Sequence, residues 1–236
     1  MTAEPEPRLA VAPDAADGDG DSAEPRASDG RTPGRRGLAT RQRLLDQTAE
    51  MLKSTTYREV KVVDIARGAS TSPATFYQYF PDVESAILVL AEEMAEERRR
   101  FADIVRAGTW QGHRGYAAAL ELADAFLDFW TEHHAVVRVI DLATGEGDGR
   151  FANIRTRLLN DVNNALAETI AERKAAGKLP DDVDPLATAG VLVAMLAHVS
   201  NHRFGFEFWG VRTADLRTSM ARIIYTAVTG QKPPAR

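Results

Sequence analysis

VKVVDIARGASTSPATFYQYF, residues 60–80, is the stretch that decides the fold of this chain. It predicts two short helices joined by a tight turn, because apolar residues recur at helical spacing on both sides of small residues. The second helix begins with small hydroxyl side chains and ends with aromatic ones. Hydroxyls at a helix N-terminus suit phosphate oxygens and base edges in a major groove, and phenol hydroxyls one turn later can reach the flanking backbone. The pattern therefore predicts a helix-turn-helix that reads DNA.

The segment from Leu44 to Leu90 resembles the N-terminal domain of the TetR family of transcriptional regulators. The order and spacing of the family are kept by LLDQTAEMLK, Ile65-Ala66, Gly68-Ala69-Ser70, Tyr77-Gln78-Tyr79-Phe80 and Glu84. Two positions depart from the family pattern. Ser70 replaces the usual Gly of the turn and is less suited to a positive φ. Val83 replaces the usual Lys and removes one expected contact to the DNA backbone.

The resemblance implies which side chains contact DNA. We expect the turn and the start of the second helix to face the groove, while the first helix and the tyrosines hold phosphates. The predicted DNA-contacting residues are Thr40, Arg41, Thr71, Ser72, Pro73, Ala74, Thr75, Tyr77, Gln78 and Tyr79. Thr40 is also expected to cap the first helix. Inside the head, Val62, Val63, Ile65 and Ala66 are expected to face the core, which Phe76 and Phe80 close.

Composition restricts the class of protein. The chain has 236 residues, no Cys and a net charge of -5. The lack of Cys excludes disulfides and suits a reducing compartment, and no secretory signal is recognisable, so we expect a cytoplasmic protein. The longest apolar run, residues 191–199, is too short to span a membrane. The acidic total argues mildly against DNA binding, but basic residues cluster beside the predicted head: Arg31, Arg35, Arg36, Arg41 and Arg43.

Four segments are expected along the chain. Residues 1–37 contain few large apolar side chains and predict a disordered arm; 38–82 form the helix-turn-helix domain, 83–230 a helical effector-binding and dimerisation domain, and 231–236 a tail. The basic end of the arm either follows the DNA or is a solvated linker, and the sequence leaves both open.

The periodicity predicts an all-α chain of about nine helices. Beyond the head, the expected helices cover residues 83–107, 116–133, 136–142, 150–176, 186–207 and 213–229. The helix from residue 186 is apolar around most of its circumference, which predicts burial on several sides. The resemblance implies that the last two helices pair with those of a second subunit, so that a homodimer reads a palindrome.

Aromatic residues predict a ligand pocket in the second domain. The segment RFGFEFWG, residues 203–210, is the richest in aromatic side chains. The aromatic residues of this domain either belong to the ordinary core and the dimer interface or line an apolar pocket. The resemblance implies a pocket for a small hydrophobic or aromatic effector. Its predicted lining is Trp110, Phe126, Phe129, Trp130, Asn163, Met195, His198, Asn201 and Phe204.

These patterns favour a ligand-responsive repressor that binds a palindromic operator as a dimer. The resemblance implies that effector binding shifts the long fourth helix and releases the DNA. The rival hypothesis is an all-α ligand-binding or scaffold protein without DNA binding. His198 and His202 have metal-ligand spacing but no obvious third ligand, so no metal site is predicted. No catalytic constellation can be assembled, and neither an enzyme nor a cofactor is expected.

Overall fold

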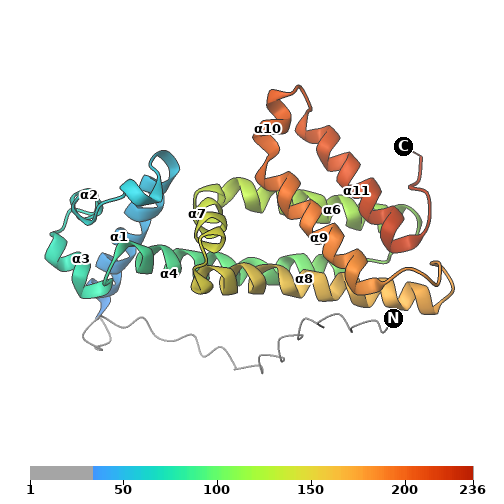
Figure 1. Cartoon of the computed structure of the whole chain (residues 1–236), viewed down its shortest axis with the longest axis horizontal. Helices are drawn as coiled ribbons and strands as arrows, with labels where there is room; N and C mark the ends of the chain where they lie inside the picture. Colours follow the sequence, from blue (N-terminus) through green and yellow to red (C-terminus); the bar gives the residue numbers. More distant parts are fainter. Residues whose placement is uncertain (1–33, 236) are drawn as a thin grey trace, which may run out of the picture.

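The computed structural model describes residues 34–235, which form a small head and a larger body (Figure 1). All regular structure in this range is helical, which confirms the all-α prediction. The predicted disorder of residues 1–33, with Arg31, lies outside the described residues. The head contains α1 (Arg35–Ser54), a 3-10 turn (Tyr57–Glu59), α2 (Val62–Gly68) and α3 (Pro73–Tyr79).

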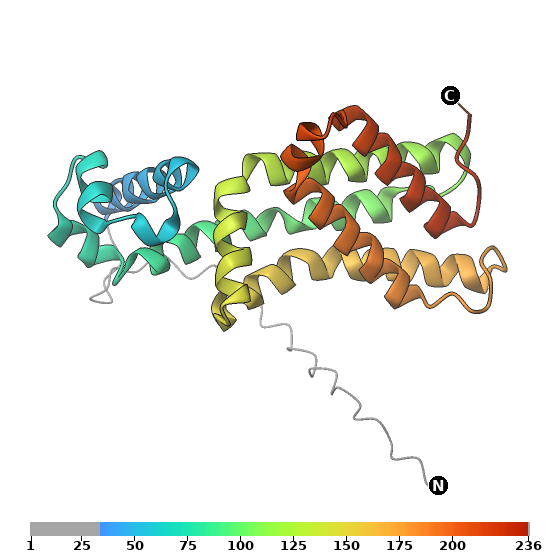
Figure 2. The ribbon, with the colours of Figure 1, turned by 45° about the horizontal axis from the view of Figure 1, so that its top comes forward.

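The body contains the remaining helices. These are α4 (Val83–Ala95), α5 (Arg99–Ala107), α6 (Gly112–Glu132), α7 (His134–Gly145), α8 (Gly149–Ala175), α9 (Pro185–Asn201), α10 (Arg203–Phe208) and α11 (Thr213–Thr229). The helix α4 leads from the head into the body, and α7 stands across the junction between them (Figure 2). None of the helices within residues 34–235 combines the length and the apolar character needed to cross a bilayer.

The first helix begins earlier than the sequence predicts. Gly34 precedes its first turn, and the amide of Leu38 donates to the Gly34 carbonyl over 3.0 Å. Residues 35–37 are therefore helical and do not belong to a disordered arm. Thr40 lies inside the helix, where its hydroxyl donates to the Arg36 carbonyl (3.0 Å) instead of capping the N-terminus.

The core of the head is closed as expected, with one exception. Leu44, Ile65 and Phe76 are fully buried, and Phe80 is almost so. Val63, expected to face inward, is 52% exposed. In so short a helix Ile65 and Ala66 occupy the inner face, and a residue two positions before Ile65 points away from it.

Two predicted helices are each divided in two. The expected helix 83–107 is interrupted by a 3-10 turn at Glu96–Arg98, where the guanidinium of Arg98 donates to the Ala95 carbonyl (3.3 Å) and pairs with Asp161 of α8. The expected helix 186–207 ends at Asn201, because His202 leaves the helical conformation and α10 starts in a new direction.

Most other helix ends lie where the residue types predict them. The carboxylates of Asp82 and Asp184 accept the amides of Ser85 and Ala187, each at 2.7 Å, and Pro185 occupies the first turn of α9. Gly108 follows the last residue of α5. These caps fix where α4, which joins the head to the body, and α9 begin.

Candidate functional site

The turn between α2 and α3 has a defined C-terminal cap. The amide of Thr71 donates to the Ala66 carbonyl (2.9 Å), and the amide of Ser70 donates to the Arg67 carbonyl (3.1 Å). Ser70 has φ 55°, a left-handed conformation. This is the hydrogen-bond pattern of a Schellman motif, which usually carries glycine at that position. The turn therefore keeps the expected geometry even though serine replaces glycine.

The N-terminus of α3 is organised by its own hydroxyls and faces solvent. The Ser72 oxygen accepts the amide of Thr75 (3.2 Å) and lies 3.0 Å from the Thr75 hydroxyl, and Pro73 occupies the first turn. Figure 1 shows α3 at the end of the head remote from the body. Four of the predicted contact residues here are exposed: Ser72, Pro73, Ala74 and Gln78. Two more, Thr71 and Thr75, are half-buried.

The predicted phosphate-binding residues lie beside this helix. Tyr77 is 52% exposed, whereas Tyr79 is half-buried against the core of the head. The guanidinium of Arg41 lies 5.4 Å from the centre of the Phe80 ring, which links the first helix to the end of α3. The Thr40 hydroxyl accepts from Arg43 over 3.0 Å. Val83, which replaces a lysine of the family pattern, is half-buried and packs against the core.

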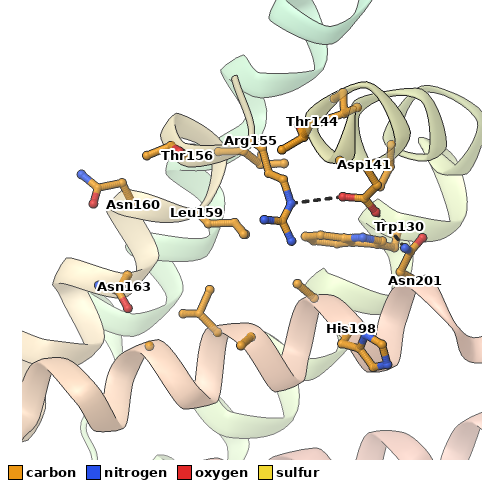
Figure 3. Close-up of a pocket in the computed structure, with 18 of the residues that line it drawn as sticks. Trp130, Asp141, Thr144, Arg155, Thr156, Leu159, Asn160, Asn163, His198 and Asn201 are labelled. Atoms are coloured by element: carbon orange, nitrogen blue, oxygen red, sulfur yellow. Dashed lines mark hydrogen bonds and ion pairs between the residues drawn. The ribbon is translucent and has the colours of Figure 1, made fainter. Parts of the chain in front are cut away.

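A cavity of about 860 Å³ lies between α7, α8 and α9 (Figure 3). Trp130 of α6 contributes a ring to it, and the volume lies within the range of cavities that hold small organic ligands. Its apolar lining is contributed mainly by aliphatic side chains: Val137, Ile140, Leu158, Leu159 and Val193.

A polar cluster lines the same cavity. The Nε of Arg155 on α8 donates to one oxygen of Asp141 on α7 (3.1 Å), and the amide of Asn201 on α9 donates to the other (2.9 Å). Three helices therefore meet at one carboxylate (Figure 3). The Thr144 hydroxyl is buried, lines the cavity and has no hydrogen-bond partner among the described residues.

The predicted pocket residues are only partly brought together. Trp130, Asn163, His198 and Asn201 line the cavity. Phe126 is fully buried behind it and stacks on Trp130 (5.1 Å between ring centres), and Phe129 packs on the edge of the same ring.

Three further predicted pocket residues do not line the cavity. The indole of Trp110 donates to the Val105 carbonyl (2.9 Å), and Met195 packs against the core without lining the cavity. Phe204 is 54% exposed on α10 beside His134, and most of the aromatic segment 203–210 is on the surface.

Sequence reasoning missed the ion pair of Arg155 and Asp141. Asp141 had a signal, because it is a carboxylate within the apolar run VVRVIDL. Arg155 had none, because it lies in a helix whose charged residues are mostly on the surface. Only the packing of α7 on α8 brings the two together.

The helix α7 also contacts the head. The guanidinium of Arg138 donates to the carbonyls of Leu52 (2.9 Å) and Thr55 (3.3 Å) at the C-terminus of α1. Just after α7, the Glu146 carboxylate accepts from the Tyr57 hydroxyl (3.3 Å) and pairs with Arg58. The hydrogen bond to Glu146 raises the pKa of Arg58 above its ordinary value. One helix thus lines the cavity and holds the head.

Comparison with known proteins agrees with this arrangement. Residues 44–85 match the family described as bacterial regulatory proteins of the tetR family, and residues 80–235 match the family described as tetracyclin repressor-like, C-terminal domain. The chain is 26% identical over 197 residues to the HTH-type transcriptional regulator EthR of Mycolicibacterium smegmatis, covering 83% of this chain and 86% of EthR.

Solved structures share the fold. The fatty acid degradation regulator FadR from Bacillus halodurans has a TM-score of 0.59 at 17% identity, covering 83% of this chain and 97% of FadR. FadR from Bacillus subtilis, solved in complex with stearoyl-CoA, has a TM-score of 0.58 at 14% identity, covering 79% and 98%. The match to the C-terminal domain family alone covers residues 80–235, which is more than half of the chain. This chain therefore belongs to the TetR family of transcriptional regulators.

Proposed function

We propose that this chain is a ligand-responsive repressor that binds a palindromic operator as a homodimer and is released by a small hydrophobic or aromatic effector. The observation that carries the proposal is the position of α7, which lines the cavity through Ile140 and Asp141 and contacts the head through Arg138. A molecule in the cavity therefore touches the helix that positions the DNA-reading part.

DNA contact is assigned to the exposed tip of α3 and its surroundings. Its small side chains, Ser72 to Thr75, can enter a major groove, and the hydroxyls of Tyr77 and Tyr79 with the guanidinium of Arg41 are the proposed phosphate contacts. Thr40 can join them only if its hydroxyl leaves the Arg36 carbonyl, to which it donates. The exposure of Ser72, Pro73 and Ala74 supports this assignment, because a buried tip could not approach a duplex.

Dimerisation is assigned to α9 and α11. Leu186 and Val191 on α9 are 60% and 70% exposed, and Ile223 on α11 is 50% exposed. Large apolar side chains gathered on neighbouring helices favour a protein contact. A two-fold pair of these helices would place two heads on one face of a palindrome.

Release of DNA is a shift between two arrangements of the heads. An effector changes DNA affinity only to the extent that it prefers the arrangement that does not bind. The wall formed by Ile140, Asp141 and Thr144 on α7 gives the effector a direct contact with the moving part. The relative from Bacillus subtilis that was solved with stearoyl-CoA supports a ligand role for the body of this fold.

The salt dependence of DNA binding tests the proposal. With ligand-free protein and a library of genomic fragments, we expect tight binding whose affinity falls steeply as salt rises, since each neutralised phosphate releases counterions. Fluorescence anisotropy at several salt concentrations measures the slope. Weak binding with a flat slope would favour the rival hypothesis of a helical ligand-binding or scaffold protein without DNA binding.

Two substitutions on α3 separate phosphate contacts from base contacts. Tyr77→Phe is expected to weaken binding to all DNA sequences by a similar factor, roughly fivefold, because one hydrogen bond to a phosphate contributes about 1 kcal/mol. Thr75→Val keeps the shape but removes a hydroxyl beside the bases, so the ranking of sequences is expected to change. Selection of binding sites from a random library compares both variants with wild type. The same ranking for all three proteins would contradict these roles.

A further inference from the structure

Arg155 gives the cavity cationic donors that the protein does not use. Within residues 34–235, its side-chain hydrogen bonding involves Nε alone, which donates to Asp141. Figure 3 shows the guanidinium extending from α8 into the space beside Trp130, with its two terminal nitrogens directed into the cavity. A guanidinium offers five N–H donors in a planar fork, so its end can still accept a two-pronged partner.

The neighbouring carboxylate is already occupied. Asp141 accepts from Arg155 with one oxygen and from the Asn201 amide with the other (2.9 Å). Both contacts hold the carboxylate in place, and the carboxylate in turn fixes the orientation of the guanidinium. Asp141 is thus a positioning residue for Arg155. A cationic ligand would find this acceptor already paired and the Arg155 charge beside it.

The rest of the polar lining contains no second carboxylate. Among the described residues that surround the cavity, Asp141 is the one acidic side chain, and the amides of Asn160 and Asn163 and the ring of His198 can donate as well as accept. The unused donors of Arg155 therefore decide the preference, and a ligand that supplies acceptor atoms satisfies them better than one that supplies donors. Beyond the polar cluster, Trp130 and the aliphatic wall require an apolar body.

We propose that the effector is an amphipathic carboxylic acid. Its carboxylate accepts the two terminal N–H groups of Arg155, and its apolar body lies against Trp130 and Ile140. The side chain of Arg155 is 51% exposed, which places the carboxylate near the mouth of the cavity, where contact with water limits the cost of desolvation. This inference rests on the proposed function, since it names the chemical class of the ligand for the same cavity.

Calorimetric titration of the full chain with matched probes tests the inference. The probes are decanoate and 4-phenylbutyrate, each compared with its primary amide and its alcohol, which keep the apolar body and lose the charge. We expect at least one acid to bind wild type at least tenfold more tightly than its amide and alcohol. Arg155→Gln is expected to remove that preference, because a neutral amide cannot form the charged pair.

Arg157→Gln is the matched control. Arg157 lies two residues along the same helix, pairs with Glu92 at 2.6 Å and does not line the cavity. It should keep the preference for acids, and thermal melting of both variants checks that they fold. Loss of the preference in Arg155→Gln alone supports the inference. Equal binding of acid and amide by wild type, or a preference that survives Arg155→Gln, overturns it, as does a lack of binding by both acids.

These outcomes are separate from those of the proposed function. Operator binding by ligand-free protein is measured by anisotropy without any acid present. If that binding is intact and a neutral or cationic molecule releases the DNA, the repressor proposal stands and only the acid is overturned. If ligand-free protein binds no DNA, the repressor proposal fails, whichever probe occupies the cavity.

Discussion

The double variant Arg138→Met with Glu146→Gln is expected to bind operator and effector but to respond to the effector poorly. It removes the hydrogen bonds of Arg138 to the end of α1 and weakens the contacts of Glu146 with Tyr57 and Arg58. Allosteric coupling free energies are typically about 1–3 kcal/mol, so loss of the polar contacts between α7 and the head is expected to remove much of the coupling. The effector-induced drop in DNA affinity should shrink by roughly tenfold.

Anisotropy of a labelled operator, with and without saturating effector, measures this drop. Arg106→Met is a suitable control, because Arg106 lies on α5, pairs with Glu168 at 4.0 Å and is remote from α7 in sequence and in its contacts. The control should respond like wild type. A double variant with a full response would show that these polar contacts do not transmit the signal and would leave the packing of α7 and α4 on α1 as the route.

The second large effect concerns stability. Gly230→Ala is expected to lower the free energy of unfolding by roughly 3 kcal/mol. Gly230 follows α11 with φ 69°, and an added Cβ would lie 2.5 Å from the Lys178 carbonyl oxygen. The left-handed conformation and the contact with rigid backbone both penalise a side chain. In a chain of this size the change corresponds to a melting temperature lower by about 10 °C.

Gly177→Ala separates the two causes. Gly177 has almost the same φ, 66°, but an added Cβ would meet nothing within 4 Å. Its cost is expected to be about 1 kcal/mol, from backbone conformation alone. Thermal melting of both variants by circular dichroism gives the comparison. Equal shifts would mean that the packing of the α11 end against Lys178 contributes nothing.

Much of the fold can be predicted from residue types at helix ends. Asp82, Asp184 and Gly108 act as the sequence predicts, because capping depends on local hydrogen bonds. Thr40 does not cap its helix, because a threonine hydroxyl also bonds well to a carbonyl four residues earlier inside a helix. At the break after Asn201, a ring nitrogen of His202 lies 3.0 Å from the His198 carbonyl oxygen, and residue types alone do not predict this contact.

The cavity is less accessible to sequence reasoning than the head. The helix α3 follows from one contiguous motif, whereas the cavity is built from four helices. Periodicity does not separate Trp130, which lines the cavity, from Phe126, which stacks behind it, or from Phe204, which is exposed on α10. The pairing of Asp141 with Arg155 depends on helix packing alone.

The shared use of α7 also limits how this protein can diverge. Asp141 and Arg138 are three residues apart on one helix, one directed to the cavity and the other to the head. Under the proposed function, a substitution on this helix that suits a new effector is expected also to change the DNA affinity of the ligand-free protein. Asn163 on α8 or Ala194 on α9 can change without altering a contact with the head. Descendants of this gene that respond to new compounds should therefore have acquired most of their changes on α8 and α9, with α7 altered last.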